Sequence, residues 1–232
     1  MRTPSFSYYV AVFDAAERII LRSGCGAATV RAVATEAGLS PSTVRHHYRT
    51  QSHLLACAFA GIEDHFARAL WSAPVRDQGA TVADVVRTLA TRLPTVGHGL
   101  HHLRLLHAYK AWARHDWDMA VLVSAHDRRL LELCQRLCLG MGLSRAQALR
   151  QAPILRALLT GLAEEIVTIA VDPPEGGLGL GVTDRLTDRG VRAILTQHVS
   201  AVQAMALSGE PGDGTGGASR TRLDGRPVDR SG

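Results

Sequence analysis

The sequence predicts an all-α protein, in which a small N-terminal helical domain is followed by a larger helical domain. Three features of the chain support this fold class. Apolar residues recur at intervals of three and four over most of its length, which is the spacing of one face of an α-helix. N-capping residues and glycines stand at the expected ends of these segments. No stretch alternates apolar and polar residues in the way that a half-buried β-strand does.

The composition agrees with an ordinary globular protein. The chain has 232 residues, of which 46% are hydrophobic and 20% charged, so it is long enough to bury a substantial core. Its formal charge of +5 is compatible with a polyanionic partner but is too small to identify one. No apolar run reaches the length of about 18 residues that a membrane span needs. Four cysteines without a secretory leader predict a reducing, cytoplasmic location.

The first predicted helix follows a frayed start at residues 1–5 and ends at Gly24. Its apolar stripe consists of Tyr9, Val12, Phe13, Ala16, Ile19 and Ile20. We expect this stripe to brace the segment that follows.

Residues 29–55 predict two short helices joined by a tight turn and followed by a third helix. Thr29 can cap the first helix, because its hydroxyl can accept a hydrogen bond from a backbone N–H one turn in. Gly38 stands where a left-handed residue is needed to end that helix. Ser40 and the proline after it start the second helix, and Thr50 offers a third cap. Three caps in register predict a helix-turn-helix unit, a motif that reads DNA.

The polar side chains of this unit are candidate DNA contacts. They are Thr29, Arg31, Ser40, Ser42, Thr43, Arg45, His46, His47, Tyr48 and Gln51. We expect Thr43, Arg45 and His46 to contact base edges, because an arginine can engage both acceptors of a guanine. Contacts to phosphates are expected near the helix ends, from Thr29, Arg31, Tyr48 and Gln51. The alternative is a solvated helix face beside a buried tyrosine, which would need no partner.

From about residue 8 to residue 56, these features resemble the N-terminal domain of the TetR family of bacterial transcriptional regulators. The matching positions are the helix VFDAAERIILRSG, then Thr29, Val30, Arg31, Ala34, Ala37, Ser40, Thr43, Tyr48 and Leu54. The resemblance implies an all-helical regulator that binds DNA, pairs through its last two long helices and senses a small molecule with its larger domain.

Two positions depart from the pattern of that family. Arg45 stands where an aromatic residue is usual, and Gln51 stands where a lysine is usual at the start of the fourth helix. Both positions commonly contact phosphates in the family. Arginine offers a stronger charge at the first position, whereas glutamine can only hydrogen-bond at the second.

The chain divides into a predicted DNA-binding domain (1–55), a helical effector-binding and dimerisation domain (56–207) and a disordered tail (208–232). The fourth helix is expected from Gln51 to about Trp71 and links the two domains. Further helices are expected at Thr81–Pro94, His98–Trp112, Asp118–Cys138, Ser144–Val171 and Thr183–Leu207. Pro153 should kink or restart the helix expected at Ser144–Val171, and residues 172–181 should form a connector.

One helix face in the larger domain is a candidate effector site. Its residues are His98, His102, Leu105, Tyr109 and Trp112, which Trp71, His101, Trp117 and His126 could join. Apolar walls with a few polar groups are typical of small-molecule sites. The alternative is that these residues are ordinary core aromatics and amphipathic helix faces.

No metal or cofactor is predicted. The histidines His98, His101 and His102 have a suitable spacing, but no acidic or cysteine neighbour completes a ligand set. Cys134 and Cys138 share a helix face and are expected to be small core residues.

The last two long helices are the expected dimer interface. Ala152–Val171 and Thr183–Leu207 have apolar faces wider than one neighbour can cover, unless both faces are filled within one subunit. No nucleophile elbow, phosphate loop or HExxH motif indicates an enzyme. We therefore expect a ligand-responsive transcriptional regulator that binds a near-palindromic operator as a homodimer and is released by a small molecule. A repressor is favoured over an activator. The alternative is a helical small-molecule-binding protein with a vestigial DNA-binding domain.

Overall fold

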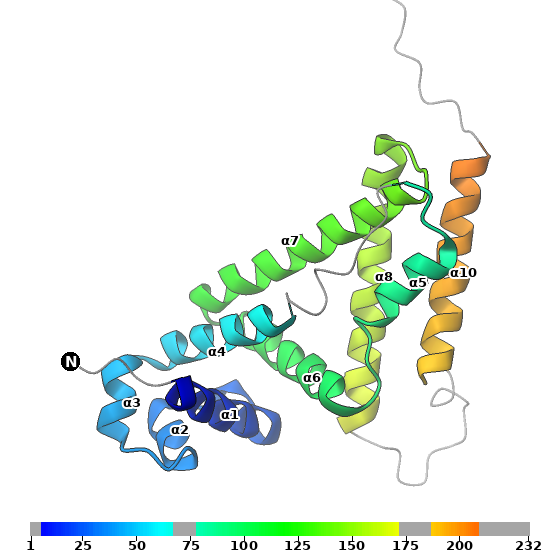
Figure 1. Cartoon of the computed structure of the whole chain (residues 1–232). Helices are drawn as coiled ribbons and strands as arrows, with labels where there is room; N and C mark the ends of the chain where they lie inside the picture. The colour runs from blue at the N-terminus through cyan, green and yellow to red at the C-terminus, as the bar shows by residue number, and fades with distance from the viewer. Residues whose placement is uncertain (1–5, 67–77, 172–186, 209–232) are drawn as a thin grey trace, which may run out of the picture.

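The computed structural model describes residues 6–66, 78–171 and 187–208, and these residues form helices and no strand (Figure 1). This confirms the predicted all-α class. The α-helices are α1 (Phe6–Ser23), α2 (Val30–Glu36), α3 (Pro41–His47), α4 (Gln51–Phe66), α5 (Val82–Ala90), α6 (Gly97–Trp112), α7 (Trp117–Gly140), α8 (Arg145–Val171) and α10 (Asp188–Leu207). A single 3-10 turn, η1 (Cys25–Ala27), follows α1. Trp71, the connector at 172–181 and the tail from 209 lie outside the described residues.

The caps predicted for the helix-turn-helix unit are all present. Thr29 accepts a hydrogen bond from the backbone N–H of Ala32, and Ser40 accepts one from Thr43. Thr50 does the same for the backbone N–H of His53 at the start of α4. Gly38 has a φ of 67°, the left-handed conformation that a side chain disfavours. Local capping chemistry therefore fixes α2, the turn and α3 in register.

The helix-turn-helix unit is held against α1 by apolar packing and by ion pairs. Val33, Ala34 and Val44 are fully buried against α1. On the surface, Arg18 and Arg22 bind the Glu36 carboxylate at 2.9 and 3.3 Å. The hydrogen bonds from the two guanidinium groups lower the pKa of Glu36.

The described residues form two buried clusters, and α6 and α7 contribute to both. The N-terminal cluster joins α1–α4 to Leu105 and Tyr109 of α6 and to Met119 of α7. The C-terminal cluster joins α5, the second half of α7, α8 and α10, with Leu103 of α6. Figure 1 shows α8 and α10 at the end of the molecule away from α1–α3. Helix α4 crosses residue 55 without a break, and the predicted boundary there remains a prediction.

Most of the later helices begin and end close to the residues that the sequence predicts. The predicted capping box of α8 is present, because Ser144 and Gln147 each bind the other's backbone N–H. Helix α8 continues across Pro153, so the helix does not restart there. Thr187 caps α10, which begins at Asp188 and not at the predicted Thr183. Among the described helices, none is both long and apolar enough to cross a bilayer.

The thiols of α7 are buried core groups. Burial raises the pKa of Cys134 to about 12 and that of Cys138 to about 11. No group of metal-binding side chains occurs within the described ranges. Both cysteines therefore serve as small apolar residues of the C-terminal cluster.

Because a neutral thiol is a poor nucleophile, we expect iodoacetamide near pH 8 to modify Cys134 and Cys138 only after denaturation. Mass mapping of the labelled peptides before and after treatment with urea measures this. The half-exposed Cys57 is the internal control, since it should be modified before the other two. Rapid labelling of Cys134 in the native protein would contradict its burial.

Candidate functional site

Helix α3 presents a polar surface to solvent. Ser42, Thr43, Arg45 and His46 are exposed, whereas Val44 on the opposite face is fully buried. The Thr43 hydroxyl lies 2.7 Å from the Ser40 hydroxyl, so the first turn of α3 is internally hydrogen-bonded. Arg45 extends beyond this turn without an ion-pair partner among the described residues. Its guanidinium is thus available to a groove of DNA.

The structure adds Tyr8, which the sequence analysis did not single out, to this surface. Its hydroxyl donates to the backbone carbonyl of Thr43 at 3.5 Å. Its ring packs edge-on against His47, with ring centroids 5.2 Å apart, and His47 in turn contacts His46 at 5.1 Å. Helix α1 therefore positions the end of α3. Only the three-dimensional proximity of residues far apart in the sequence reveals this role.

Tyr48 does not occupy the position predicted for a phosphate contact. The residue is 3% exposed, and its ring packs between Phe13 and His53. Its hydroxyl is enclosed and has no hydrogen-bond partner in the described structure, and burial raises its pKa above the usual value. Tyr48 is therefore a core residue that fixes the end of α3 against α1 and α4.

The Gln51 side chain is also turned inward. Its amide Nε2 donates to the backbone carbonyls of Cys25 at 2.8 Å and Gly26 at 3.2 Å. These bonds tie the start of α4 to the η1 turn. The side chain expected at a phosphate is thus occupied inside the protein, whereas the backbone N–H groups at the start of α4 remain candidates for an anion there.

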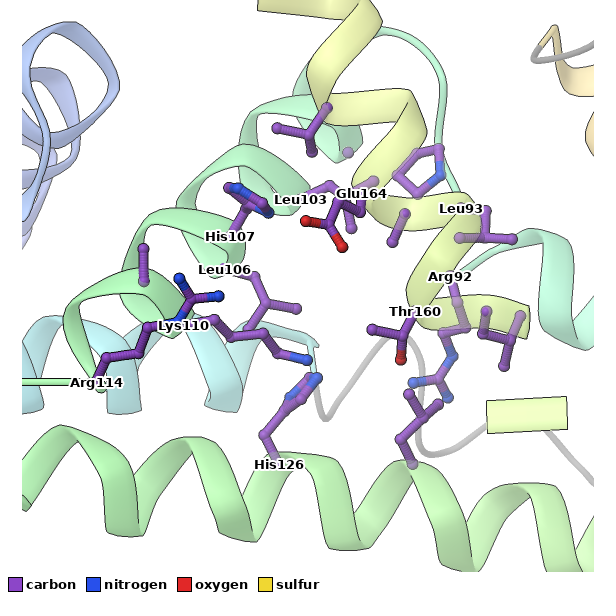
Figure 2. A pocket seen from close by; sticks show the side chains of 17 residues that line it. Arg92, Leu93, Leu103, Leu106, His107, Lys110, Arg114, His126, Thr160 and Glu164 are labelled. Carbon is purple, nitrogen blue, oxygen red and sulfur yellow. The ribbon is translucent and has the colours of Figure 1, made fainter. Parts of the chain in front are cut away.

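A cavity of about 350 Å³ lies among α6, α7, α8 and the turn after α5 (Figure 2). Its apolar lining consists of Leu93, Pro94, Leu103, Leu106, Ala111, Leu130, Leu159, Ala163 and Val167. Its polar side chains are Arg92, His107, Lys110, Arg114, His126, Thr160 and Glu164. Figure 2 shows Lys110 of α6 and His126 of α7 pointing toward one another on one side of the cavity. A volume of this size with mixed walls suits a small organic molecule.

Of the predicted effector residues that the structure describes, His126 lines the cavity. The predicted face of α6 does not border the cavity. Leu105 and Tyr109 are fully buried in the N-terminal cluster, and Trp112 packs against it. His98 is exposed and His102 half-buried, and neither contributes to the lining. The Trp117 ring is 82% exposed.

This correction has a physical cause in the composition of α6. The helix carries two stripes at helical spacing, and its true cavity face is the second of them. That face consists of Gly99, Leu103, Leu106, His107, Lys110 and Ala111, and Arg114 just after the helix continues it. Periodicity identifies both stripes but does not state which neighbouring helix each one meets. The available signal was the presence of His107 and Lys110 among the small and apolar residues of this stripe, with Arg114 just beyond the helix.

A buried carboxylate connects the cavity wall to α4. Glu63 of α4 is 8% exposed and lies 2.7 Å from Nδ1 of His126 and 3.2 Å from the Arg129 guanidinium. At its other end, α4 is joined to α7 by a hydrogen bond from the Ser52 hydroxyl to Asp116. That bond, with one from the backbone N–H of Met119, lowers the pKa of Asp116. Helices α4 and α7 are thus joined by polar contacts at both ends of α4.

Comparison with known proteins agrees with the helix-turn-helix geometry. A family model for bacterial regulatory proteins of the tetR family matches residues 12–57. Residues 12–57 are therefore similar to the DNA-binding domain of that family, which is the resemblance that the sequence indicates.

One curated relative with this kind of domain is the HTH-type transcriptional regulator PksA of Bacillus subtilis (strain 168). It is 32% identical over 108 residues, which are 47% of this chain and 52% of PksA. The match thus spans about half of the relative.

Solved structures with the same fold extend over most of the chain. A transcriptional regulator from Rhodococcus sp. Rha1 has a TM-score of 0.64 at 17% identity, covering 85% of this chain and 96% of its own. A protein from Saccharomonospora viridis, proposed to be a transcriptional regulator and solved in complex with choline, has a TM-score of 0.63 at 20% identity. That match covers 84% of this chain and 97% of the other. At these identities the comparison establishes a shared fold.

Arg45 and Gln51, the two departures from the TetR pattern, have different structural roles. Arg45 is exposed on α3, as a DNA contact requires. Gln51, which replaces the usual lysine, instead satisfies two backbone carbonyls of η1. In this protein, the side chain at the start of α4 therefore contributes to internal structure.

Proposed function

We propose that this protein is a cytoplasmic, ligand-responsive transcriptional repressor that binds a near-palindromic operator as a homodimer. The observation that carries the proposal is the TetR-type helix-turn-helix, whose α3 presents Thr43, Arg45 and His46 to solvent. Arg31 and the N-terminal ends of α2 and α4 are the proposed phosphate contacts, together with Thr29 and the backbone of Gln51.

The first experiment tests the proposed base contact of Arg45. Replacing it with alanine should weaken binding to DNA from the protein's own promoter by about 10- to 100-fold, because a bidentate arginine–guanine contact contributes roughly 1–3 kcal/mol. Gel-shift titration at fixed salt measures the change. Arg128→Ala, at an exposed position of α7, removes the same charge away from α3 and should leave the affinity nearly unchanged. Equal losses in both variants would contradict a specific role for Arg45.

A homodimer is supported by the exposed face of α8. The α8 stripe, defined as Leu149, Pro153, Ile154, Ala157 and Gly161, is apolar or small throughout. Leu149 and Ile154 are 54% and 51% exposed in the single chain. On α10, the exposed residues Ala193, Gln197, Ala201 and Met205 recur every four positions. Two copies related by a two-fold axis would cover these faces and place two α3 helices on successive groove faces, about 34 Å apart.

The cavity is the proposed effector site, and α4 is the proposed link to DNA. A molecule bound among α6, α7 and α8 would shift α7, which is joined to α4 through Asp116 and Glu63. Movement of α4 would change the separation of the two α3 helices and favour the state that does not bind DNA. The choline complex of the Saccharomonospora viridis protein supports ligand binding in this fold.

The competing function is a small-molecule-binding protein whose DNA-binding domain is vestigial. Sequence-selective, salt-sensitive binding to promoter DNA distinguishes the two, because only a working reading unit gives both properties. Selection of bound sequences from random DNA would then define the operator.

A further inference from the structure

The charges that line the cavity are mostly positive. Arg92, Lys110 and Arg114 carry three positive charges, whereas Glu164 is the one carboxylate among the lining residues of the described structure. Lys110 is partly neutralised by Asp127 at 2.7 Å, while Arg114 makes no ion pair within the described ranges. His107 of α6 and His126 of α7 add two imidazoles to the lining. The local electrostatic environment therefore favours an anionic group over a cationic one.

Within the described structure, the lining also lacks the aromatic side chains that commonly hold organic cations. No phenylalanine, tyrosine or tryptophan is among the described residues that line the cavity. Quaternary ammonium groups are commonly held by aromatic faces, through cation–π attraction. The cavity thus differs in chemistry from a site that would suit choline.

One residue of the cavity wall also binds Glu63, the buried carboxylate of α4. His126 lines the cavity and binds Glu63 through Nδ1 at 2.7 Å. Arg92 also lines the cavity, where burial lowers the pKa of its guanidinium to about 10, so this group keeps its positive charge at neutral pH. The Nδ1 contact of His126 therefore joins the cavity wall to the anchor of α4.

We propose that the cavity binds an amphipathic organic acid, whose anionic group competes with Glu63 for His126 and thereby weakens one of the polar contacts that join α7 to α4. The apolar body of the ligand lies against Leu103, Leu106 and Leu159, which come from two different helices. This proposal names the effector class and the coupling residue of the function proposed above, and it rests on that function for its effect on DNA.

Ligand charge is tested directly with matched probes on the full chain. Isothermal titration calorimetry compares decanoate, decanamide and decyltrimethylammonium, and separately compares 2-naphthoate with 2-naphthamide. We expect the acid of at least one series to bind, and to bind about tenfold more tightly than its amide, a difference of about 1.4 kcal/mol. Absence of binding by both acids, or tighter binding of the amides or of the quaternary ammonium, would overturn the proposal.

Competition with Glu63 is tested by Glu63→Gln, which keeps the shape of the side chain and removes its charge. We expect the affinity for the acid probe to rise about threefold to tenfold, while the affinity for its amide stays the same. Glu132→Gln, at an exposed position on α7, is the matched control and should change neither value. His126→Ala should lower the affinity for the acid. An acid affinity that falls or stays constant in Glu63→Gln would contradict the competition.

Gel shifts of the same variants on promoter DNA keep the two proposals separable. Failure of the unmodified protein to bind promoter DNA selectively would remove the proposed function but would leave the acid–amide preference measurable by calorimetry. Selective DNA binding together with a preference for the cation would remove only the present inference. If both hold, the acid probe should release DNA from the parent protein at a higher concentration than from Glu63→Gln.

Discussion

Replacing Phe59 with alanine is expected to lower the free energy of unfolding by about 3–5 kcal/mol, the range for deleting a buried aromatic ring. The Phe59 side chain on α4 is 2% exposed. Its ring meets Tyr109 of α6 edge-on, with centroids 5.2 Å apart and planes at 75°. Such aromatic pairs add about 0.5–1.5 kcal/mol to the effect of burial alone. The contact joins α4 to the larger domain, so promoter affinity should also fall.

The change is measured by urea denaturation followed by far-UV circular dichroism, with gel shifts performed well below the midpoint. The matched control is Tyr109→Phe, on the other side of the same contact. The Tyr109 hydroxyl is buried and has no hydrogen-bond partner in the described structure, so its removal loses no bond and relieves a desolvated group. We expect its midpoint to equal or slightly exceed that of the parent. A Phe59→Ala midpoint close to that of Tyr109→Phe would show that the contact does not hold α4.

The DNA-reading unit could be predicted in detail because local chemistry defines it. The hydroxyls of Thr29, Ser40 and Thr50 each cap the helix that follows them, and Gly38 takes the left-handed conformation that its position requires. None of these interactions depends on a residue more than one turn away. Local sequence features are therefore sufficient to predict this part of the fold.

The roles of Tyr48 and Gln51 could not be predicted in the same way. Their position at the end of α3 and the start of α4 is local information, but the direction of their side chains is not. Tyr48 is drawn into the core by Phe13 of α1, and Gln51 is held by carbonyls that lie about 25 residues earlier in the sequence. A polar residue near a helix end is thus an ambiguous sign of a phosphate contact when the preceding turn offers unsatisfied carbonyls.

The position of the cavity could not be predicted from the sequence, for a related reason. Helix α6 packs on both sides, with Tyr109 in the N-terminal cluster and Leu103 in the C-terminal one. Both faces are apolar enough to look like a site, and only the packing of α7 and α8 decides which one borders the cavity. The sequence indicates His126 as a candidate, but its bond to Glu63 depends on the approach of α4 to α7, which no spacing in the sequence predicts.

The prediction with the largest effect on DNA binding is that Gly161→Arg separates the proposed dimer. Gly161 is exposed within α8, and a side chain added there would meet nothing within 4 Å in the single chain. A glycine inside a helix costs about 1 kcal/mol relative to alanine, so its presence at an exposed position suits the close approach of a partner helix. An arginine can pair with Glu165 on its own helix and should leave the isolated subunit folded.

Loss of the second reading unit should reduce operator affinity by about 100- to 10,000-fold, because two linked contacts gain that much from effective concentration. Light scattering at micromolar concentration should give the mass of one chain for Gly161→Arg and of two for the parent. Val121→Arg introduces the same group on α7, at a position that is 54% exposed, and should remain dimeric with full affinity. A dimeric Gly161→Arg protein would place the interface elsewhere, whereas a monomeric one with undiminished affinity would mean that a single α3 suffices to bind the operator.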